Sequence, residues 1–252
     1  MFLGAGVSAS AGVGNWDNLL CHLTKARGIR PLNGVADNVV QGRYLIDLYK
    51  NNFNDLTQDV KSFLYQNLKK SALITSIAGI IKQCNVESVV TYNYDDLLET
   101  ELGVYSNNVC YPIYGLSRVP NGVKTPIYHV HGYLPRTKNG ASSIIVLGEK
   151  EYHDIYRESN NWGSVEQLHA LNRNVCFFIG LSMTDPNLRR LLDLSAGNDS
   201  EVGRVHFVFL IREPSRPGYE SFMERTMRDF GINCIWYNNH NDLPSLLNDL
   251  LT

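Results

Sequence analysis

Short apolar runs alternate with amphipathic segments along most of the chain. Runs rich in Val, Ile and Phe that are apolar on both faces predict buried strands, and apolar residues that recur every three or four positions predict helices. Strands are predicted at residues 86–91, 126–130, 143–147, 174–179, 205–211 and 232–236, with a fragment at 1–3. Helices are predicted among them at residues 96–102, 149–158, 186–194, 219–230 and 243–251. Strands buried on both faces that alternate with helices are typical of an α/β fold with a Rossmann-like, doubly wound, mostly parallel sheet.

One connection near the start of the chain is too long for a simple crossover. Between residues 14 and 85 the pattern is helical only, with segments predicted at residues 16–26, 35–50, 56–68 and 72–82. Ser71 precedes the last of these and is a suitable N-cap, because its side-chain oxygen can accept from free backbone N–H groups. We therefore expect a single domain over residues 1–252 with an inserted helical layer at about residues 16–83.

The composition and the charge narrow the class of protein. Of the 252 residues, 44% are hydrophobic and 19% are charged, which suits a folded globular chain rather than a disordered one. Lys and Arg number 23 against 25 Asp and Glu, so the net charge of −2 supplies no field that would attract a phosphate backbone. The apolar runs are shorter than the roughly 18 residues of a membrane-spanning helix. We therefore expect neither a nucleic-acid partner nor a membrane partner.

Five cysteines are scattered along the chain without any CxxC pair: Cys21, Cys84, Cys110, Cys176 and Cys234. An odd number at wide spacing argues against a disulfide framework and against a structural zinc site. The chain opens without the charged and apolar pattern of a secretion signal. These features favour a cytoplasmic protein, and we expect no metal.

A glycine-rich loop directly follows the first strand fragment. Gly4, Ala5, Gly6 and Ser8 belong to the sequence GAGVSA, which fits the pattern G-x-G-x-x-A. Glycines let a backbone turn tightly and approach a diphosphate, and the serine adds a hydroxyl donor. A generic tight turn is the alternative, and a nicotinamide dehydrogenase is disfavoured because no strand with an acidic residue follows near residues 28–31. Because so few residues precede the loop, we expect that the N-terminus is truncated and that strand residues lie upstream.

Polar residues also follow the predicted strand at residues 86–91. Asn93 and Asp95 lie in the sequence TYNYD at the carboxyl end of this strand, where open α/β sheets bind ligands. Both side chains can face such a crevice. For Asp95 an equally good interpretation is a cap of the following helix, since a carboxylate there accepts from free N–H groups and interacts favourably with the helix dipole.

Two histidines, His129 and His131, end the next predicted strand in the sequence HVHG. Alternation along a strand places them on one face, which would suit a metal pair, but no third ligand follows at a suitable spacing. A histidine at the end of a strand suits a general base, since its ordinary pKa is about 6.5 and Gly132 leaves room for a ligand. The alternative, a histidine of the core or the surface without a chemical role, fits His129 better than His131.

The sequence FIGLSMTDPNL combines the end of a strand with the start of a helix. Asp185 as N-cap and Pro186 in the first helical position explain this segment structurally. Gly180 and Ser182 can also hold a ribose or a phosphate at the N-terminus of that helix.

The order of these motifs, from the glycine loop through TYNYD and HVHG to GLSMTDPNLRRLL, resembles the sirtuin family. More narrowly, the chain resembles the sirtuin-like domains of bacterial anti-phage defence proteins. The resemblance implies a Rossmann-like NAD⁺ site in which the loop GAGVS wraps the diphosphate. It also implies Asn93 and Asp95 near the nicotinamide ribose, His131 as the catalytic histidine, and Gly180 and Ser182 in contact with the nucleotide.

The likeness extends from residue 1 to about residue 194 and includes the sequence LGEKEYHDIY. Two features differ from the protein-deacylating sirtuins. The chain lacks their four-cysteine zinc module, and residues 13–17 are VGNWD where those enzymes carry isoleucine, proline, aspartate, phenylalanine and arginine. The defence-type relatives also lack the zinc module, and they hydrolyse NAD⁺ to nicotinamide and ADP-ribose.

The resemblance therefore implies an NAD⁺ hydrolase that serves anti-phage defence by NAD depletion, with NAD⁺ as substrate and with no metal. Asn93 would orient the water or the ribose, and His131 would accept a proton from the water or from a ribose hydroxyl. Two alternatives are an NAD-dependent protein deacylase without zinc, and a non-catalytic module that senses NAD or ADP-ribose. Defence domains of this type are held idle until they assemble or meet a partner, which implies a homo-oligomer or a separate regulatory or sensor chain.

Overall fold

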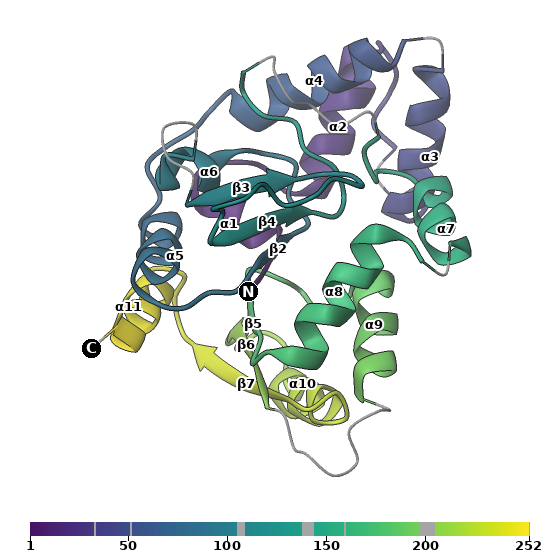
Figure 1. Ribbon diagram of the computed structural model, residues 1–252. Helices are drawn as coiled ribbons and strands as arrows, with labels where there is room; N and C mark the ends of the chain where they lie inside the picture. Colours follow the sequence, from purple (N-terminus) through teal and green to yellow (C-terminus); the bar gives the residue numbers. More distant parts are fainter. Residues whose placement is uncertain are drawn as a thin grey trace.

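The computed structural model describes residues 1–32, 34–50, 52–104, 109–137, 144–158, 160–196 and 205–251. Within these residues, seven strands form one sheet in the order β3-β4-β2-β1-β5-β6-β7, and every neighbouring pair is parallel. The strands are β1 (Phe2–Leu3), β2 (Val89–Thr91), β3 (Cys110–Ile113), β4 (Thr125–His129), β5 (Phe177–Ile179), β6 (His206–Ile211) and β7 (Ile232–Tyr237). Figure 1 shows helices on both sides of this sheet. The predicted doubly wound α/β fold is confirmed.

The strand order of the sheet reverses beside β1. On one side of β1 lie β2, β4 and β3 in spatial order, and on the other lie β5, β6 and β7, which come later in the chain. Phe2 pairs with Val90 of β2 and with Phe178 of β5, so the two-residue strand lies in the interior of the sheet. Open parallel sheets bind ligands at the carboxyl ends of their strands, where the order reverses. The fold therefore places a candidate site at the ends of β1, β2 and β5.

One predicted strand is wrong, and one observed strand is unpredicted. Residues 144–147 form no strand, and residue 143 lies outside the described residues. Most of this segment is buried all the same, and the N–H of Val146 donates to the carbonyl of His131 at 2.8 Å. The apolar run is a buried loop. A short apolar run in a sequence is equally consistent with a buried loop and with a buried strand. The unpredicted strand is β3, which contains Pro112 and lies at the edge of the sheet, where proline is tolerated.

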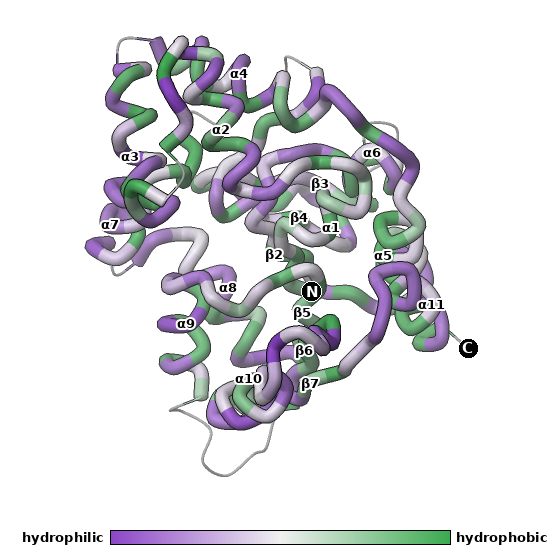
Figure 2. The backbone as a smooth tube through the Cα atoms, turned by 180° about the vertical axis from the view of Figure 1, so that it is seen from behind, coloured by the Kyte–Doolittle hydropathy of each residue, from purple (hydrophilic) through white to green (hydrophobic). Residues whose placement is uncertain are grey.

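Two groups of helices cover the two faces of the sheet. One face packs against α1 (Ala5–Ser10), α5 (Ala72–Gln83), α6 (Leu97–Leu102) and α11 (Asp242–Asn248), which a short 3-10 turn follows, and the other against α8 (Trp162–Arg173), α9 (Pro186–Ala196) and α10 (Tyr219–Arg228). Leu3 of β1 belongs to the first core and Phe2 to the second, as expected of alternating side chains. In Figure 2 the colour along α9 alternates between hydrophilic and hydrophobic, which is typical of a helix with one buried side. None of the helices in the described ranges is long and apolar enough to cross a membrane.

A third core belongs to helices beyond the end of the sheet. Figure 1 shows α2 (Trp16–Ala26), α3 (Asn38–Leu48) and α4 (Phe53–Tyr65) together, with α7 (Glu149–Arg157) beside α3. Leu20, Leu45 and Val60 pack in this core, one from each of the first three helices. In contrast, α5 packs on the sheet, and Ser71 caps it as predicted by accepting the N–H of Ile74 at 3.1 Å. The predicted helical layer thus consists of α2, α3 and α4, and α5 is a covering helix of the sheet.

Candidate functional site

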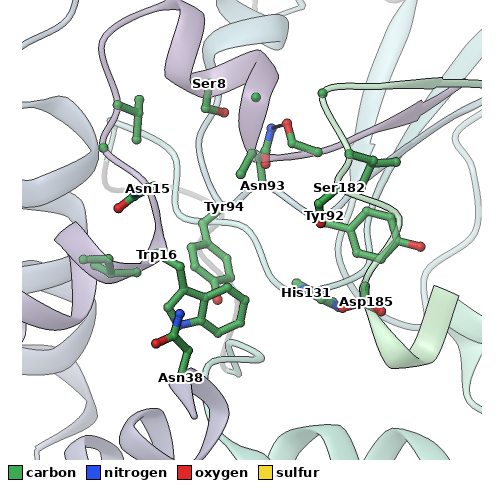
Figure 3. Close-up of a pocket in the computed structure, with 18 of the residues that line it drawn as sticks. Ser8, Asn15, Trp16, Asn38, Tyr92, Asn93, Tyr94, His131, Ser182 and Asp185 are labelled. Carbon is green, nitrogen blue, oxygen red and sulfur yellow. Dashed lines mark hydrogen bonds between the residues drawn. The ribbon is translucent and has the colours of Figure 1, made fainter. Parts of the chain in front are cut away.

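A cavity of about 470 Å³ opens at the carboxyl ends of β1, β2 and β5. The loops after these strands form one wall and α2, α3 and α4 contribute to the other, as Figure 3 shows for the labelled side chains. Pockets that bind small molecules commonly have volumes of about 300–1,000 Å³. The cavity is lined by every residue that the sequence analysis assigns to the site: Gly4, Ala5, Gly6, Ser8, Asn93, Asp95, His131, Gly180 and Ser182.

The glycine loop is shaped by its contact with the end of β5. The N–H of Gly4 donates to the carbonyl of Ile179 at 3.0 Å, and the N–H of Gly6 donates to the carbonyl of Gly180 at 2.9 Å. A Cβ atom on Gly6 would lie 2.8 Å from the Cα of Gly180, whose own φ is +67°. Glycine is therefore required on both segments because the two backbones touch. Two N–H groups of the loop are used within the protein rather than directed at a ligand.

Ser8 and Asp95 form a buried pair beside the loop. The Ser8 hydroxyl donates to Oδ2 of Asp95 at 2.6 Å, and Oδ1 of Asp95 accepts the N–H of Leu97 at 3.2 Å. Burial raises the pKa of the Asp95 carboxyl, and the hydrogen bonds from Ser8 and Leu97 partly oppose this rise. The hydroxyl that the sequence assigns to a ligand is thus bonded to Asp95. Asp95 in turn accepts an N–H at the start of α6, as its capping interpretation requires.

Asn93 connects the ends of the first two strands. Its side-chain N–H donates to the carbonyl of Gly4 at 2.9 Å, and its backbone N–H donates to the hydroxyl of Thr91 at 3.1 Å. No described residue forms a hydrogen bond with the side-chain oxygen of Asn93, which lines the cavity. The protein therefore orients this amide through its nitrogen, and its oxygen is available as an acceptor.

His129 is fixed within the frame of the site. The side chains of His129 and Glu99 are each 1% exposed, and Nε2 of His129 lies 2.6 Å from Oε1 of Glu99. Nδ1 of His129 lies 3.0 Å from the carbonyl oxygen of Asn93. Both imidazole nitrogens are thus occupied, so His129 cannot bind a substrate or a metal without losing one of these contacts. The core interpretation of His129 agrees with this environment.

The two histidines do not form one site. β4 ends at His129, and the chain turns before His131, so the alternation assumed for a strand does not extend to the second histidine. Across the described residues, no three side chains of His, Cys, Asp or Glu gather in a way that could hold a metal ion.

His131 faces the cavity between two aromatic rings. The ring centroids of Tyr92 and Tyr152 lie 4.8 and 5.5 Å from that of the imidazole, both with an edge directed at a face. Burial lowers the pKa of His131 below its ordinary value of 6.5, and the negative charge of Asp185 opposes this effect. Neither imidazole nitrogen has a hydrogen-bond partner in the described part of the protein. The imidazole is therefore neutral at pH 7 and has a free nitrogen, as a general base requires.

Gly132 has a different role from the predicted one. Its φ is +112°, and a Cβ atom there would lie 2.7 Å from the carbonyl oxygen of Ile144. The space beside Gly132 is therefore filled by the buried segment 144–147. Glycine at this position makes room for the protein chain and not for a ligand.

Asp185 begins α9 and also lines the cavity, where Figure 3 shows it beside His131. Its Oδ1 accepts the N–H of Leu188 at 2.9 Å, which confirms the predicted N-cap before Pro186. Its Oδ2 accepts the hydroxyl of Tyr152 at 3.0 Å. From the sequence, Asp185 is expected to be a cap only, and the structure adds its carboxylate to the wall of the site.

The opposite wall contains residues that the sequence analysis does not identify. Trp16 from α2 and Asn38 from the start of α3 lie on this side of the cavity, near Tyr94 of the loop after β2 (Figure 3). Nε1 of Trp16 is buried and has no hydrogen-bond partner among the described residues. Residues 13–17 stand out in the sequence only because they differ from the motif of the deacylases, and no pattern in them indicates that Trp16 reaches a cavity.

The described lining of the cavity contains two carboxylates and no Lys or Arg. The acids are Asp95 and Asp185. The hydroxyls of Ser182 and Thr184, on the segment before α9, lie 2.7 Å apart. A phosphate-bearing ligand would therefore be held by backbone groups and hydroxyls rather than by cationic side chains.

The sequence is similar to that of a known family and of curated enzymes. A family profile described as a SIR2-like domain matches residues 87–235, more than half of the chain. The NAD(+) hydrolase ThsA of Cytobacillus dafuensis is 25% identical over 224 residues, which cover 87% of this chain and 42% of that protein. The NAD(+) hydrolase ThsA of Bacillus cereus (strain MSX-D12) is 23% identical over 264 residues, which cover 98% of this chain and 52% of that protein. The chain thus spans about half the length of the curated relatives that it matches.

A solved structure described as "Structural Basis for the Mechanism and Regulation of Sir2 Enzymes" also matches. Its sequence identity is 13% and its TM-score is 0.49, with 99% of this chain and 90% of that chain covered.

Proposed function

Because this chain belongs to the SIR2-like domain family, we propose that it hydrolyses the bond between nicotinamide and ribose in NAD⁺, releasing nicotinamide and ADP-ribose. The observation that carries the proposal is one cavity lined by the glycine loop, by Asn93 and by a buried, neutral His131. The relatives named NAD(+) hydrolase support the same reaction. The family membership also confirms the resemblance that the order of the motifs predicts.

In this proposal NAD⁺ lies across the strand ends. The diphosphate lies against the backbone of Gly4, Ala5 and Gly6, and Gly180 and Ser182 contact the nucleotide from the end of β5. Asp95 supports the nicotinamide ribose indirectly, through its hydrogen bond with Ser8 beside the glycine loop. The described lining offers the diphosphate no cationic side chain, and the N–H groups of Gly4 and Gly6 are used within the protein. The remaining N–H of the loop, on Ala5, and the hydroxyls of Ser182 and Thr184 would therefore supply the hydrogen bonds.

The reaction requires one proton transfer by the protein. The glycosidic bond breaks through an oxocarbenium-like transition state, and its electron pair leaves with the nicotinamide nitrogen. A water oxygen bonds to the same ribose carbon, and a nitrogen of His131 accepts a proton of that water. The oxygen of the Asn93 amide orients the water or the ribose. The proton passes from His131 to solvent after the products form, which restores the neutral imidazole.

Product analysis of NAD⁺ incubated with the protein tests this proposal. We expect equal amounts of nicotinamide and ADP-ribose without any added peptide, and a loss of about 10²-fold for Asn93→Ala because the reacting groups are no longer oriented. Asn54→Ala, which removes an exposed amide from α4, is the matched control and should keep the full rate. Because self-association is predicted to activate the domain, the assay is run over a range of protein concentrations, with the oligomeric state measured at each.

Other outcomes of this assay contradict the proposal in defined ways. Nicotinamide release only in the presence of an acyl-lysine peptide would identify a deacylase. Thermal stabilisation by NAD⁺ that stays intact for hours would identify a sensor module.

The cellular role is part of the proposal. We propose that hydrolysis serves anti-phage defence by depleting NAD, under control of a homo-oligomer or of a separate regulatory chain. Cells that express the chain should lose NAD after phage infection, and cells that express Asn93→Ala should not. Equal NAD levels in both cultures during infection would contradict this role.

A further inference from the structure

His131 has one charged neighbour in the described part of the protein. The groups that face it come from three elements: Tyr92 from the segment after β2, Tyr152 from α7 and Asp185 from the start of α9. Figure 3 shows Asp185 beside His131 on the same side of the cavity. Both tyrosines meet the imidazole in T-shaped contacts and are neutral, so the carboxylate is the group whose charge acts on it.

Each oxygen of the Asp185 carboxylate is held by a different donor. Oδ1 accepts the N–H of Leu188 at 2.9 Å, and Oδ2 accepts the hydroxyl of Tyr152 at 3.0 Å. The carbonyl oxygen of Asp185 accepts the N–H of Arg189 at 3.0 Å as well. The carboxylate therefore has a fixed position. A helix cap alone would require only one of its two oxygens to accept a hydrogen bond.

The aromatic partners are fixed in a similar way. Tyr152 is 5% exposed, and its hydroxyl is committed to Asp185. The hydroxyl of Tyr92 donates to the side-chain oxygen of Gln167 on α8. Burial, with the charge of Asp185 as a further cause, raises the pKa of both tyrosines, so they stay protonated at pH 7. Tyr152 is thus a donor to Asp185 throughout the physiological range of pH.

We propose that Asp185, oriented by Tyr152, is a positioning residue that stabilises the positively charged imidazole of His131 after it accepts a proton from the attacking water. The inference rests on the proposed function. The proton stays on His131 until it passes to solvent, and Asp185 remains ionised, as the carboxylate of a Ser-His-Asp triad does. Asp185 acts through His131 and does not itself contact the reacting atoms.

The variant Asp185→Asn separates this role from helix capping. Asparagine caps helix N-termini about as well as aspartate, so α9 keeps its cap and only the charge is lost. Tyr152→Phe removes the hydroxyl that orients Asp185 and keeps the ring beside His131. Asp193→Asn makes the same change of charge at an exposed position of α9 and is the matched control.

The first readout is the pH dependence of kcat/KM for NAD⁺ hydrolysis. Asp185→Asn should lower kcat at least about tenfold. It should also move the acid limb to lower pH, because the carboxylate that raises the pKa of His131 is gone. Tyr152→Phe should lower kcat less, and Asp193→Asn should match the wild type. An Asp185→Asn enzyme with the wild-type kcat, or with the wild-type acid limb, overturns the inference.

The second readout does not depend on activity. The titration of His131, followed by NMR and assigned with His131→Ala, should have a lower midpoint in Asp185→Asn than in the wild type and in Asp193→Asn. Equal midpoints overturn the inference even if the enzyme is active. If the wild type releases no nicotinamide, the proposed function fails, whereas a lower midpoint in Asp185→Asn still supports the pairing of Asp185 with His131.

Discussion

His129 and His131 are two positions apart in the sequence, but they lie in regions of the site with opposite properties. Around His129, every polar atom of the imidazole is bonded, to Glu99 and to the backbone of Asn93. Around His131, two tyrosine rings pack on the imidazole in T-shaped contacts, and its nitrogens, at the cavity, have no hydrogen-bond partner among the described residues. The first region is a frame that fixes the loop after β2, and the second is the reactive surface that this frame supports. Burial does not distinguish the two histidines, because both are less than 5% exposed. They differ in whether their imidazole nitrogens form hydrogen bonds.

The largest expected effect is on stability, when the frame is broken. Removing one member of a buried, hydrogen-bonded pair leaves the other unsatisfied, so His129→Ala and Glu99→Ala should each lower the free energy of unfolding by about 3–5 kcal/mol. His131→Ala removes no hydrogen bond that the described residues form and should cost only about 1 kcal/mol. Urea unfolding of the three variants measures both values. A larger loss for His131→Ala than for His129→Ala would contradict the division into frame and reactive surface.

A second test concerns the close approach of the glycine loop and the end of β5. Gly180→Ala places a Cβ 2.6 Å from the backbone nitrogen of Val7 at a φ of +67°, so we expect a loss of about 3 kcal/mol and weaker binding of NAD⁺. Gly122 also has a positive φ, of +87°, but no atom lies within 4 Å of its Cβ position. Gly122→Ala should therefore cost only about 1 kcal/mol of backbone strain and leave NAD⁺ affinity unchanged. Equal losses in unfolding experiments would show that the close approach is not what requires glycine at Gly180.

These two tests concern features that the sequence predicts to different degrees. The alternation of apolar strands and helices predicts the doubly wound sheet, and Ser71 and Asp185 are recognisable as caps because a cap depends on neighbours within one turn. The loops that carry the motifs line one cavity, because the ends of parallel strands meet at one edge of the sheet.

Partners that are distant in the sequence could not be predicted. The bond from Ser8 to Asp95 spans 87 positions, and the contact of His129 with Glu99 depends on how α6 packs beneath the sheet. The segment 144–147 fills the space beside Gly132 and is therefore apolar. Burial favours the same apolar residues in a loop as in a strand, so its composition resembles that of a strand. Trp16 reaches the cavity only because α2 packs across the end of the sheet.

The charge of the reactive surface predicts a substrate preference. Asp95 and Asp185 line the cavity, and its described lining contains no Lys or Arg that could neutralise a third phosphate. We therefore expect kcat/KM for NADP⁺ to be at least about tenfold lower than for NAD⁺, a difference of roughly 1.4 kcal/mol. Initial rates with both dinucleotides measure this ratio. A preference for NADP⁺ would contradict the account of how the cavity holds its ligand.

The smallest expected effect is the pH dependence of stability that His131 contributes. The pKa of His131 in the folded protein lies below 6.5, so the unfolded chain takes up a proton first as the pH falls. The contribution of the neutral imidazole is complete above about pH 6.5 and decreases as the pH falls toward the folded-state pKa. The stability of His131→Phe should therefore change less between pH 7.5 and pH 5.5 than that of the wild type, as measured by urea midpoints. The exposed control His153→Phe should behave as the wild type, and an unchanged pH dependence in His131→Phe would contradict the lowered pKa.

The rate of nicotinamide release by His131→Ala relative to the wild type, at saturating NAD⁺ and with the folded fraction of each protein measured, tests the central claim most directly. A general base contributes about 10²–10⁴ in rate, so the variant should be slower by that factor while it remains folded. His153→Ala, which removes an exposed histidine of α7, should keep the wild-type rate. Equal rates for His131→Ala and the wild type would contradict the claim that His131 is the base of an NAD⁺-hydrolysing site.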